Sequence, residues 1–190
     1  MTLKEEIERN PERGARRLAA EYGQRLFETA RHFCRNDQDA EDLTFRTLSR
    51  ALSRFDGFDE RASPFSWLYR MLVNLLRTDA RRKGANALDF TAEVPDVVDP
   101  APDPAETLAA FEDATAVRAA VDALSPPLRA VVVFRYFEDL TVPEIARILA
   151  VPEGTVKSRL HLAKIALRRN LERTIRPELS SNPTERSFHT

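Results

Sequence analysis

Cysteine, glycine and tryptophan are scarce in this sequence. Its 190 residues include one Cys, five Gly and one Trp, against twelve Pro. The single Cys34 excludes an intrachain disulfide and a metal cage built from cysteines. Because glycine is rare while Leu, Ala, Arg and Glu are common, the composition favours helices. We expect neither a resident metal nor a cofactor.

Long apolar segments are also missing. The N-terminal residues MTLKEEIERNPERGARR are charged throughout, so they lack the apolar stretch of a secretory signal. No apolar run approaches the roughly 20 residues that a membrane-spanning helix needs. With 43% hydrophobic and 31% charged residues, the composition is that of a soluble globular protein. We therefore expect a cytoplasmic protein without membrane insertion.

The formal net charge of −1 hides an uneven distribution. Residues 24–84 contain 12 Lys or Arg and 9 Asp or Glu, a net charge of +3. Residues 85–124 contain 1 and 9, a net charge of −8, and residues 125–190 contain 11 and 7, a net charge of +4. Two mildly basic blocks thus flank an acidic one, as in a two-part polyanion binder with an acidic tether.

Residues 141–171 predict two helices joined by a tight turn. Thr141 and Glu144 have the spacing of a capping box, and residues 150–154 interrupt the helical pattern. In the second helix one face is apolar: Val156, Leu160, Ala163, Leu167 and Leu171. The opposite face is largely basic: Lys157, Ser158, His161, Arg168 and Arg169. This layout is typical of a helix-turn-helix that reads DNA. The alternative is an ordinary helical hairpin with a solvated basic face.

A second informative helix is predicted over residues 65–82. Arg70, Asn74, Arg77 and Arg81 recur on one face, which Trp67 shares by its spacing from Asn74. A tryptophan beside Arg and Asn on a solvent-facing stripe suits stacking on unpaired bases. In the alternative reading Trp67 packs on the core and the arginines are only solvated.

Further helices are expected over residues 24–34, 39–55, 106–123 and 128–137. A polar helix from Pro11 would precede them, and the polar residues after Arg173 would fray. The helix over 39–55 would bury Leu43, Phe45, Leu48, Leu52 and Phe55. Residues 131–133 are three valines that suit a strand. We predict helix there, because Ser125 and two prolines provide a helix start and a lone strand would lack a partner.

Four acids, Asp37, Asp39, Glu41 and Asp42, cluster at the start of the helix over 39–55. They could be imagined as a metal site for phosphoryl transfer. The sequence has neither a second ligand cluster nor a phosphate-binding glycine loop beside them. We therefore interpret them as the cap and the acidic first turn of a helix.

Several motifs together resemble bacterial extracytoplasmic-function sigma factors. They occur in the right order over about residues 20–173. The motifs are Asp39-Ala-Glu-Asp-Leu43, Arg54-Phe-Asp-Gly57, Trp67-Leu-Tyr-Arg-x-x-x-Asn74, Leu124-Ser-Pro-x-x-Arg129 and Pro152-Glu-Gly-Thr-Val-Lys-Ser-Arg-Leu160.

The resemblance implies an all-α protein with two small helical domains joined by an acidic linker. Region 2 would span residues 20–88, the linker 89–115, and region 4 with its helix-turn-helix 116–174. Residues 1–19 would be an N-terminal extension and 175–190 a flexible tail. The implied function is a non-enzymatic sigma factor that directs promoter-specific initiation. Its partners would be core RNA polymerase, promoter DNA and an anti-sigma factor.

The resemblance also implies residue roles. The melted minus-ten element would be contacted by the 56–66 loop and by Trp67, Arg70, Asn74, Arg77, Thr78 and Arg81. The minus-thirty-five duplex would be contacted by Thr155, Lys157, Ser158, Arg159, His161 and Lys164. Arg159 leans toward the core by its periodicity, which favours a phosphate over a base contact. The polymerase would be contacted by Asp39, Asp42, Phe45, Arg46 and Ser49.

The chain departs from the family pattern at several positions. Phe45 and Arg46 stand where a Gln and an acid are usual, and Ala150 replaces the usual turn glycine. That alanine is tolerable if its φ is not positive. Leu162, where Arg is common, and Ile165 fall on the outer face of their helix, where they could touch thymine methyls or a partner protein.

Two other functions remain open from the residues alone. A stand-alone helix-turn-helix regulator would bind duplex DNA without polymerase, at a two-fold symmetric site. A phosphoryl-transfer enzyme using the acids of 37–42 would show metal-dependent turnover.

Overall fold

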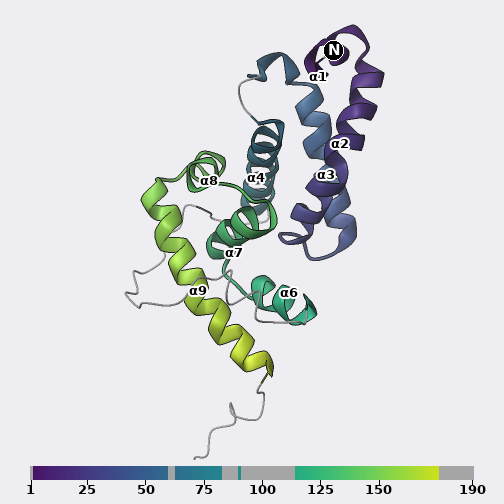
Figure 1. Ribbon diagram of the computed structural model, residues 1–190. Coiled ribbons are helices and arrows are strands. Elements are labelled where there is room, and N and C mark those ends of the chain that lie inside the picture. The colour runs from purple at the N-terminus through teal and green to yellow at the C-terminus, as the bar shows by residue number, and fades with distance from the viewer. Residues whose placement is uncertain (1, 60–62, 83–89, 91–113, 176–190) are drawn as a thin grey trace, which may run out of the picture.

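The computed structural model describes residues 2–59, 63–82, 90 and 114–175. Within these ranges every regular element is a helix, and the helices form two groups (Figure 1). The all-α prediction is therefore confirmed. None of the described helices is long and apolar enough to cross a membrane.

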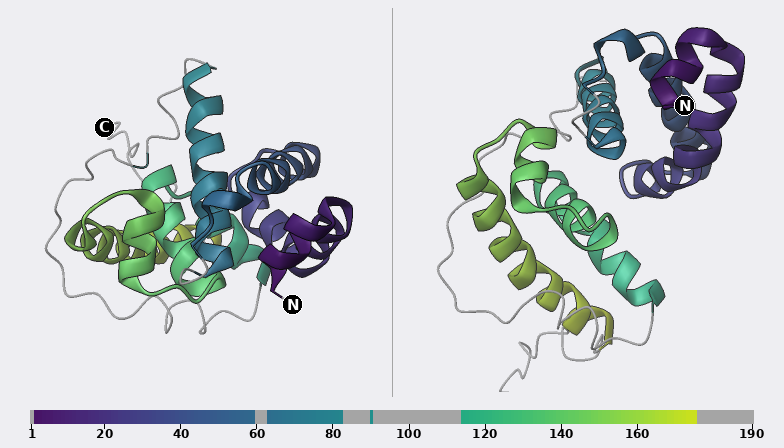
Figure 2. Two further views of the ribbon diagram at one scale, coloured as in Figure 1. Left: turned by 90° about the horizontal axis from the view of Figure 1, so that it is seen from above. Right: turned by 45° about the horizontal axis from the view of Figure 1, so that its top comes forward.

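The N-terminal group contains α1 (Leu3–Arg9), α2 (Pro11–Arg31), α3 (Asp37–Leu52), the short 3₁₀ helix η1 (Phe55–Gly57) and α4 (Pro64–Arg82). Helix α2 packs against both α1 and α3, and α3 packs against α4. Figure 2 shows this group set apart from the C-terminal helices when the top of the molecule is turned forward.

The C-terminal group contains α6 (Ala114–Asp122), α7 (Pro126–Val132), the π-helical turn η3 (Val133–Phe137), α8 (Val142–Leu149) and α9 (Glu153–Ile175). The long helix α9 packs against α6, α7 and α8. Helix α8 also lies against α4 of the first group (Figure 1). The buried apolar side chains of both groups form one continuous cluster.

The predicted starts of α3 and α8 are confirmed by their hydrogen bonds. Asn36 caps α3, because its Oδ1 accepts from the Asp39 backbone amide at 2.7 Å. The Thr141 amide donates to Glu144 Oε2 at 2.8 Å at the start of α8. Donors from the Thr141 side chain and backbone lower the pKa of Glu144, so its carboxylate stays charged at the positive end of the helix.

Some predicted boundaries are corrected. The segment from Pro11 and the segment predicted over 24–34 merge into one helix, α2, which ends at Arg31. Gly23 lies between them and does not break the helix, because a glycine lowers helix stability without blocking a helical hydrogen bond as a proline does. Of the helix expected over 106–123 the structure describes only α6, and residues 91–113 of the acidic linker lie outside the described residues. The domain boundaries therefore stay predictions.

Phe45 is not buried, contrary to the prediction. Its side chain is 71% exposed, because the buried stripe of α3 follows different positions. That stripe consists of Ala40, Leu43, Thr44, Thr47 and Ala51. A residue two positions after Leu43 lies about 200° around the helix from it and so faces solvent.

The three valines 131–133 lie in helical structure, as predicted. All three are fully buried, where α7 passes into η3 at the centre of the C-terminal group. A helix buried on every side carries no amphipathic pattern, which explains its strand-like composition. Ser125 occupies the N-cap position of α7 but makes no side-chain cap hydrogen bond there.

Helix α1 is docked onto α2 through a close approach at Gly14. A Cβ atom at this glycine would lie 2.4 Å from Ile7 Cγ1 and 2.7 Å from the Ile7 Cα. Glu6, 5% exposed, pairs with Arg13 at 2.6 Å and Arg17 at 2.9 Å. The N-terminal extension is thus a packed part of the first helical group, and it also lies against η1.

We predict that Gly14→Ala displaces α1, because the backbone of Ile7 cannot yield the space. The free energy of unfolding should fall by about 1–3 kcal/mol in chemical denaturation. Gly23→Ala is the matched control, since its Cβ would meet only Leu48 Cδ1 at 3.9 Å. That control should gain up to about 1 kcal/mol from helix propensity. Equal effects of the two substitutions would contradict the tight α1–α2 contact.

Ala150 ends α8 in the left-handed region, with φ 52° and ψ 49°. An alanine would be unstrained here only with a negative φ, and the φ of Ala150 is positive. An L-residue with a Cβ costs roughly 1–2 kcal/mol in this conformation, whereas glycine adopts it freely. The turn geometry is kept despite this cost because the Val151 amide bonds to the Ala146 carbonyl at 3.1 Å.

We predict that Ala150→Gly stabilises the C-terminal group by up to about 1 kcal/mol, after the greater chain entropy of glycine is subtracted. The matched control is Ala19→Gly, at an exposed position inside α2. It should destabilise by about 1 kcal/mol. Thermal unfolding of both variants decides the point, and a loss of stability in both would refute the strain.

Candidate nucleic-acid interface

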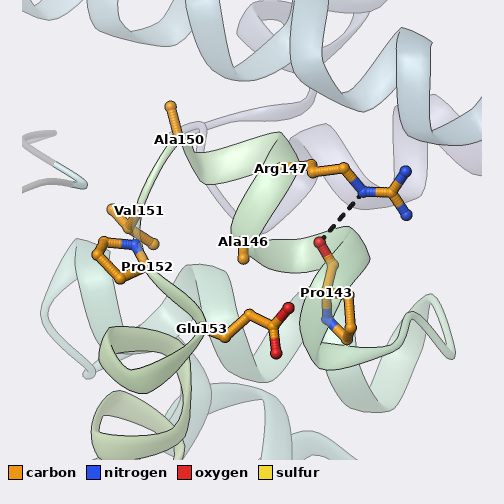
Figure 3. A pocket seen from close by; sticks show the side chains of 7 residues that line it. All are labelled: Pro143, Ala146, Arg147, Ala150, Val151, Pro152 and Glu153. Carbon is orange, nitrogen blue, oxygen red and sulfur yellow. Dashed lines mark hydrogen bonds between the residues drawn. The ribbon is translucent and has the colours of Figure 1, made fainter.

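Helices α8 and α9 form the predicted helix-turn-helix. The turn is short: α8 ends at Leu149 and α9 begins at Glu153, just after Pro152. An open groove runs beside this turn, lined by Pro143, Ala146, Arg147, Ala150, Val151, Pro152 and Glu153 (Figure 3). The Arg147 side chain bends back to donate from Nε to the Pro143 carbonyl at 3.3 Å. The groove contains none of the predicted DNA contacts, which lie farther along α9.

Most of the predicted minus-thirty-five residues reach the surface of α9. Lys157 is exposed, and the other four are half-buried: Thr155, Ser158, His161 and Lys164. Exposed Arg168 and Arg169 extend the basic surface one to two turns farther. The helix can therefore present a cationic face to a phosphate backbone.

Arg159 lies on the core side of α9, as predicted, whereas the predicted outward placement of Leu162 is wrong. Arg159, 1% exposed, is buried, and its guanidinium donates to the carbonyl of Phe90. Leu162 is 7% exposed and belongs to the core, so it is not on the outer face in this structure. The buried stripe keeps Val156 and Ala163 of the predicted apolar face but is rotated toward Arg159 and Leu162, so that Leu160 is only half-buried. Ile165 is half-buried.

Helix α4 carries the predicted minus-ten stripe. Arg70, Asn74, Thr78 and Arg81 are exposed along one side of it. Thr78 Oγ1 donates to the Asn74 backbone carbonyl at 2.8 Å. Exposed arginines at both ends of an amide-bearing helix face suit a single strand of nucleic acid.

Trp67 is not a solvent-facing platform. Its half-buried ring packs against Phe55, with centroids 5.6 Å apart, and against Phe58 at 5.0 Å. Phe55 and Phe58 are themselves buried and lie 5.3 Å from each other. The alternative of a core-packed tryptophan is thus the observed one. This aromatic cluster anchors the described start of the 56–66 loop to the helix that follows it.

Arg77, the remaining residue of the minus-ten set, is turned toward the C-terminal group. One of its terminal nitrogens donates to the Leu149 carbonyl at 2.6 Å. Its guanidinium also lies over the Phe90 ring, 5.8 Å from the centroid. In this conformation the Arg77 guanidinium takes part in the interface between the two helical groups.

The predicted polymerase contacts lie on α3. Asp39, Asp42, Phe45 and Ser49 are exposed. Arg46 is half-buried and forms a bidentate pair with Asp79 of α4, at 2.8 and 2.9 Å. The hydrogen bonds to Asp79, and after them the one to Asp42, raise the pKa of Arg46. The Arg46–Asp79 pair joins α3 to α4.

A polar network that is not visible in the sequence joins the two groups. Glu138, just after η3, is bound by Arg25 and Thr29 of α2 and by Tyr69 of α4. Its partners are 69 to 113 residues away, so no local spacing could have revealed them. Among the described residues no group of three or more His, Cys, Asp or Glu could hold a metal ion.

Comparison with known proteins identifies both groups of helices. Residues 18–86 match the family model for sigma-70 region 2, and residues 114–167 match sigma-70 region 4. The chain is 28% identical over 161 residues to the ECF RNA polymerase sigma factor SigW of Bacillus subtilis, covering 79% of this chain and 84% of that protein. It is 33% identical over 148 residues to the RNA polymerase sigma-E factor of Streptomyces avermitilis, covering 77% and 79%.

A solved structure shares the fold. The crystal structure of the sigma factor RpoE with the anti-sigma factor NepR, from Bartonella quintana, matches with a TM-score of 0.64 at 22% identity. The match covers 83% of this chain and 96% of that one. With both sigma regions present in order and a relative at 33% identity, the chain belongs to the extracytoplasmic-function group of the sigma-70 family, whose members direct transcription initiation.

Proposed function

We propose that this sigma factor recognises promoters at two points, melting the minus-ten element with α4 and reading the minus-thirty-five element with α9. The observation that carries the proposal is the pair of exposed polar helix faces, one in each sigma region. The proposed regions span residues 20–88 and 116–174, with 89–115 as the acidic tether. The chain itself has no reaction to perform, since core polymerase supplies the chemistry.

The α4 face favours strand opening by binding the product of opening. Arg70 and Arg81 would neutralise the strand backbone, while the Asn74 amide can both donate to and accept from a base edge. Free energy gained from an unpaired strand offsets the few kcal/mol needed to unstack a base. No ATP is needed, because binding alone shifts the equilibrium toward the open duplex.

The α9 face would enter the major groove of the upstream duplex. Lys157, exposed on the second turn, is placed for a phosphate or a guanine edge, and Thr155 and Ser158 can bond to either. Two sites of modest affinity become useful when one tether holds them at the separation of the promoter elements.

Core polymerase would bind the exposed face of α3, where Phe45 offers an apolar anchor between charged neighbours. The factor would therefore act in the cytoplasm, with the polymerase. An anti-sigma factor is a further proposed partner, supported by the solved relative that is bound to one.

Transcription in vitro with core polymerase, on a library of promoter fragments, tests the proposed function. We expect sequence-dependent initiation only when both factor and core enzyme are present. A stand-alone regulator would instead bind duplex DNA tightly without polymerase, at a two-fold symmetric site. No sequence-dependent initiation across the library would overturn the proposal.

Lys157→Ala should weaken the dependence on the upstream element and lower the salt slope of promoter binding by about one, because one counterion fewer is released. The matched control is Lys4→Ala, which removes the same charge from α1 in the N-terminal extension. Binding of holoenzyme is measured over a series of salt concentrations. An unchanged slope for Lys157→Ala removes it from the contact set.

Asn74→Ala should reduce open complexes about tenfold while initial docking changes little, because its hydrogen bonds to a base form only after melting. Permanganate reactivity of unpaired thymines reports opening, and filter binding at low temperature reports docking. Gln24→Ala, an exposed amide on α2, is the control. Equal losses in both measurements would contradict the assigned role.

A further inference from the structure

The carboxylate of Glu138 is buried in the opposite half of the molecule. Its side chain is 4% exposed although it belongs to the loop after η3 in region 4. Arg25 Nε donates to its Oε2 at 2.6 Å, and Arg25 also donates to its backbone carbonyl at 2.9 Å. The hydroxyls of Thr29 and Tyr69 donate to its two oxygens.

Each of these partners belongs to region 2. Burial, and next the hydrogen bond to Glu138, raise the pKa of Tyr69 well above its ordinary value of 10.0, so its hydroxyl stays protonated as a donor. A buried carboxylate is stable only while its charge and lone pairs are satisfied. Separation of the two halves is therefore the event that breaks this network, because it removes every named partner at once.

Other contacts lie in the same interface between regions 2 and 4, hereafter the seam. Arg129 of α7 donates to the His32 carbonyl at 3.0 Å. Phe134 lies 5.4 Å from Tyr69 and 6.3 Å from Phe33, measured between ring centroids. The His32 ring lies 4.7 Å from that of Phe137. The seam thus has an aromatic interior with the Glu138 carboxylate at its polar centre.

The seam also holds one proposed DNA contact from each region. Arg77 of the minus-ten set donates to the last carbonyl of α8, that of Leu149. Arg159 of the minus-thirty-five set is buried and donates to Phe90, whose ring lies against Phe33 and beneath Arg77. Each guanidinium must leave its own partners before it can reach a phosphate.

We propose that Glu138 is an intramolecular latch that holds the free sigma factor closed, withholding Arg77 and Arg159 from promoter DNA. Closure is a property of the free chain and is testable without polymerase. The consequence for DNA binding rests on the function proposed above. Opening exchanges the partners of Glu138 for water and frees one arginine in each DNA-reading region.

The distance between the two halves of the free protein tests the latch. Spin labels are placed at Glu41→Cys on α3 and Arg169→Cys on α9, both exposed, in a Cys34→Ala background. Pulsed electron paramagnetic resonance should give one narrow distribution of distances between the two labels in the otherwise unchanged chain. Glu138→Ala should add a longer, broader component, raising the ratio of open to closed protein about tenfold or more.

Two further variants separate a latch from a folding defect. Tyr69→Phe removes only the hydroxyl on the region 2 side, and Glu138→Gln keeps the size of the side chain while removing its charge. If the contact is direct, Glu138→Ala and Tyr69→Phe together open the chain less than the product of their separate effects. Glu28→Gln, an exposed acid on α2 bonded to Gln24 of the same helix, is the matched charge control and should leave the distribution unchanged.

Promoter binding by the free, unlabelled chain provides the second readout. Glu138→Ala should bind a forked promoter fragment at least several-fold more tightly than the parent, while Glu28→Gln should not. A narrow distance distribution that stays the same in Glu138→Ala and Glu138→Gln overturns the latch, whatever transcription shows. Opening without any gain in DNA binding overturns the withholding of the arginines. Opening confirmed beside failed initiation on the promoter library would refute the proposed function and leave the latch standing.

Discussion

The placement of the two sigma regions depends on a charge that one region buries in the other. Glu138 is covered by the opposite half, and Arg25, Thr29 and Tyr69 replace the water it loses. Such a contact is cooperative, since an unpaired buried carboxylate is far more costly than an exposed one. The aromatic packing around Glu138 adds buried apolar area, and the directed hydrogen bonds of Glu138 fix how the two regions are aligned.

This constraint connects the two faces proposed to read DNA. The exposed stripes on α4 and α9 remain at the surface in the closed form, whereas Arg77 and Arg159 are engaged at the seam. Between Arg82 and Ala114 the chain has 31 residues, which can extend to about 100 Å. The covalent connection therefore permits wide separation of the regions, and the seam contacts determine whether it occurs.

The sequence predicted what local pattern controls. Capped starts at Asn36 and Thr141, the extent of α4 and the helix-turn-helix all follow from spacing of a few residues. It failed where tertiary contacts decide: Phe45 faces solvent, Trp67 packs on Phe55 and Phe58, and Leu162 is core. Helical periodicity gives the direction of a side chain only approximately. It cannot separate a residue at the edge of the buried stripe from one on the exposed side. The partners of Glu138 could not be found at all, because they are distant in sequence.

We propose that one chain reads two promoter elements held at a set separation. The most direct measurement is transcription in vitro by the holoenzyme on promoters whose two elements are moved apart or together in single base-pair steps. The account predicts initiation at one narrow range of separations. Activity should be lost when half a helical turn, about 5 base pairs, places the elements on opposite faces of the duplex. Equal initiation at every separation, or initiation that needs only one element, would contradict it.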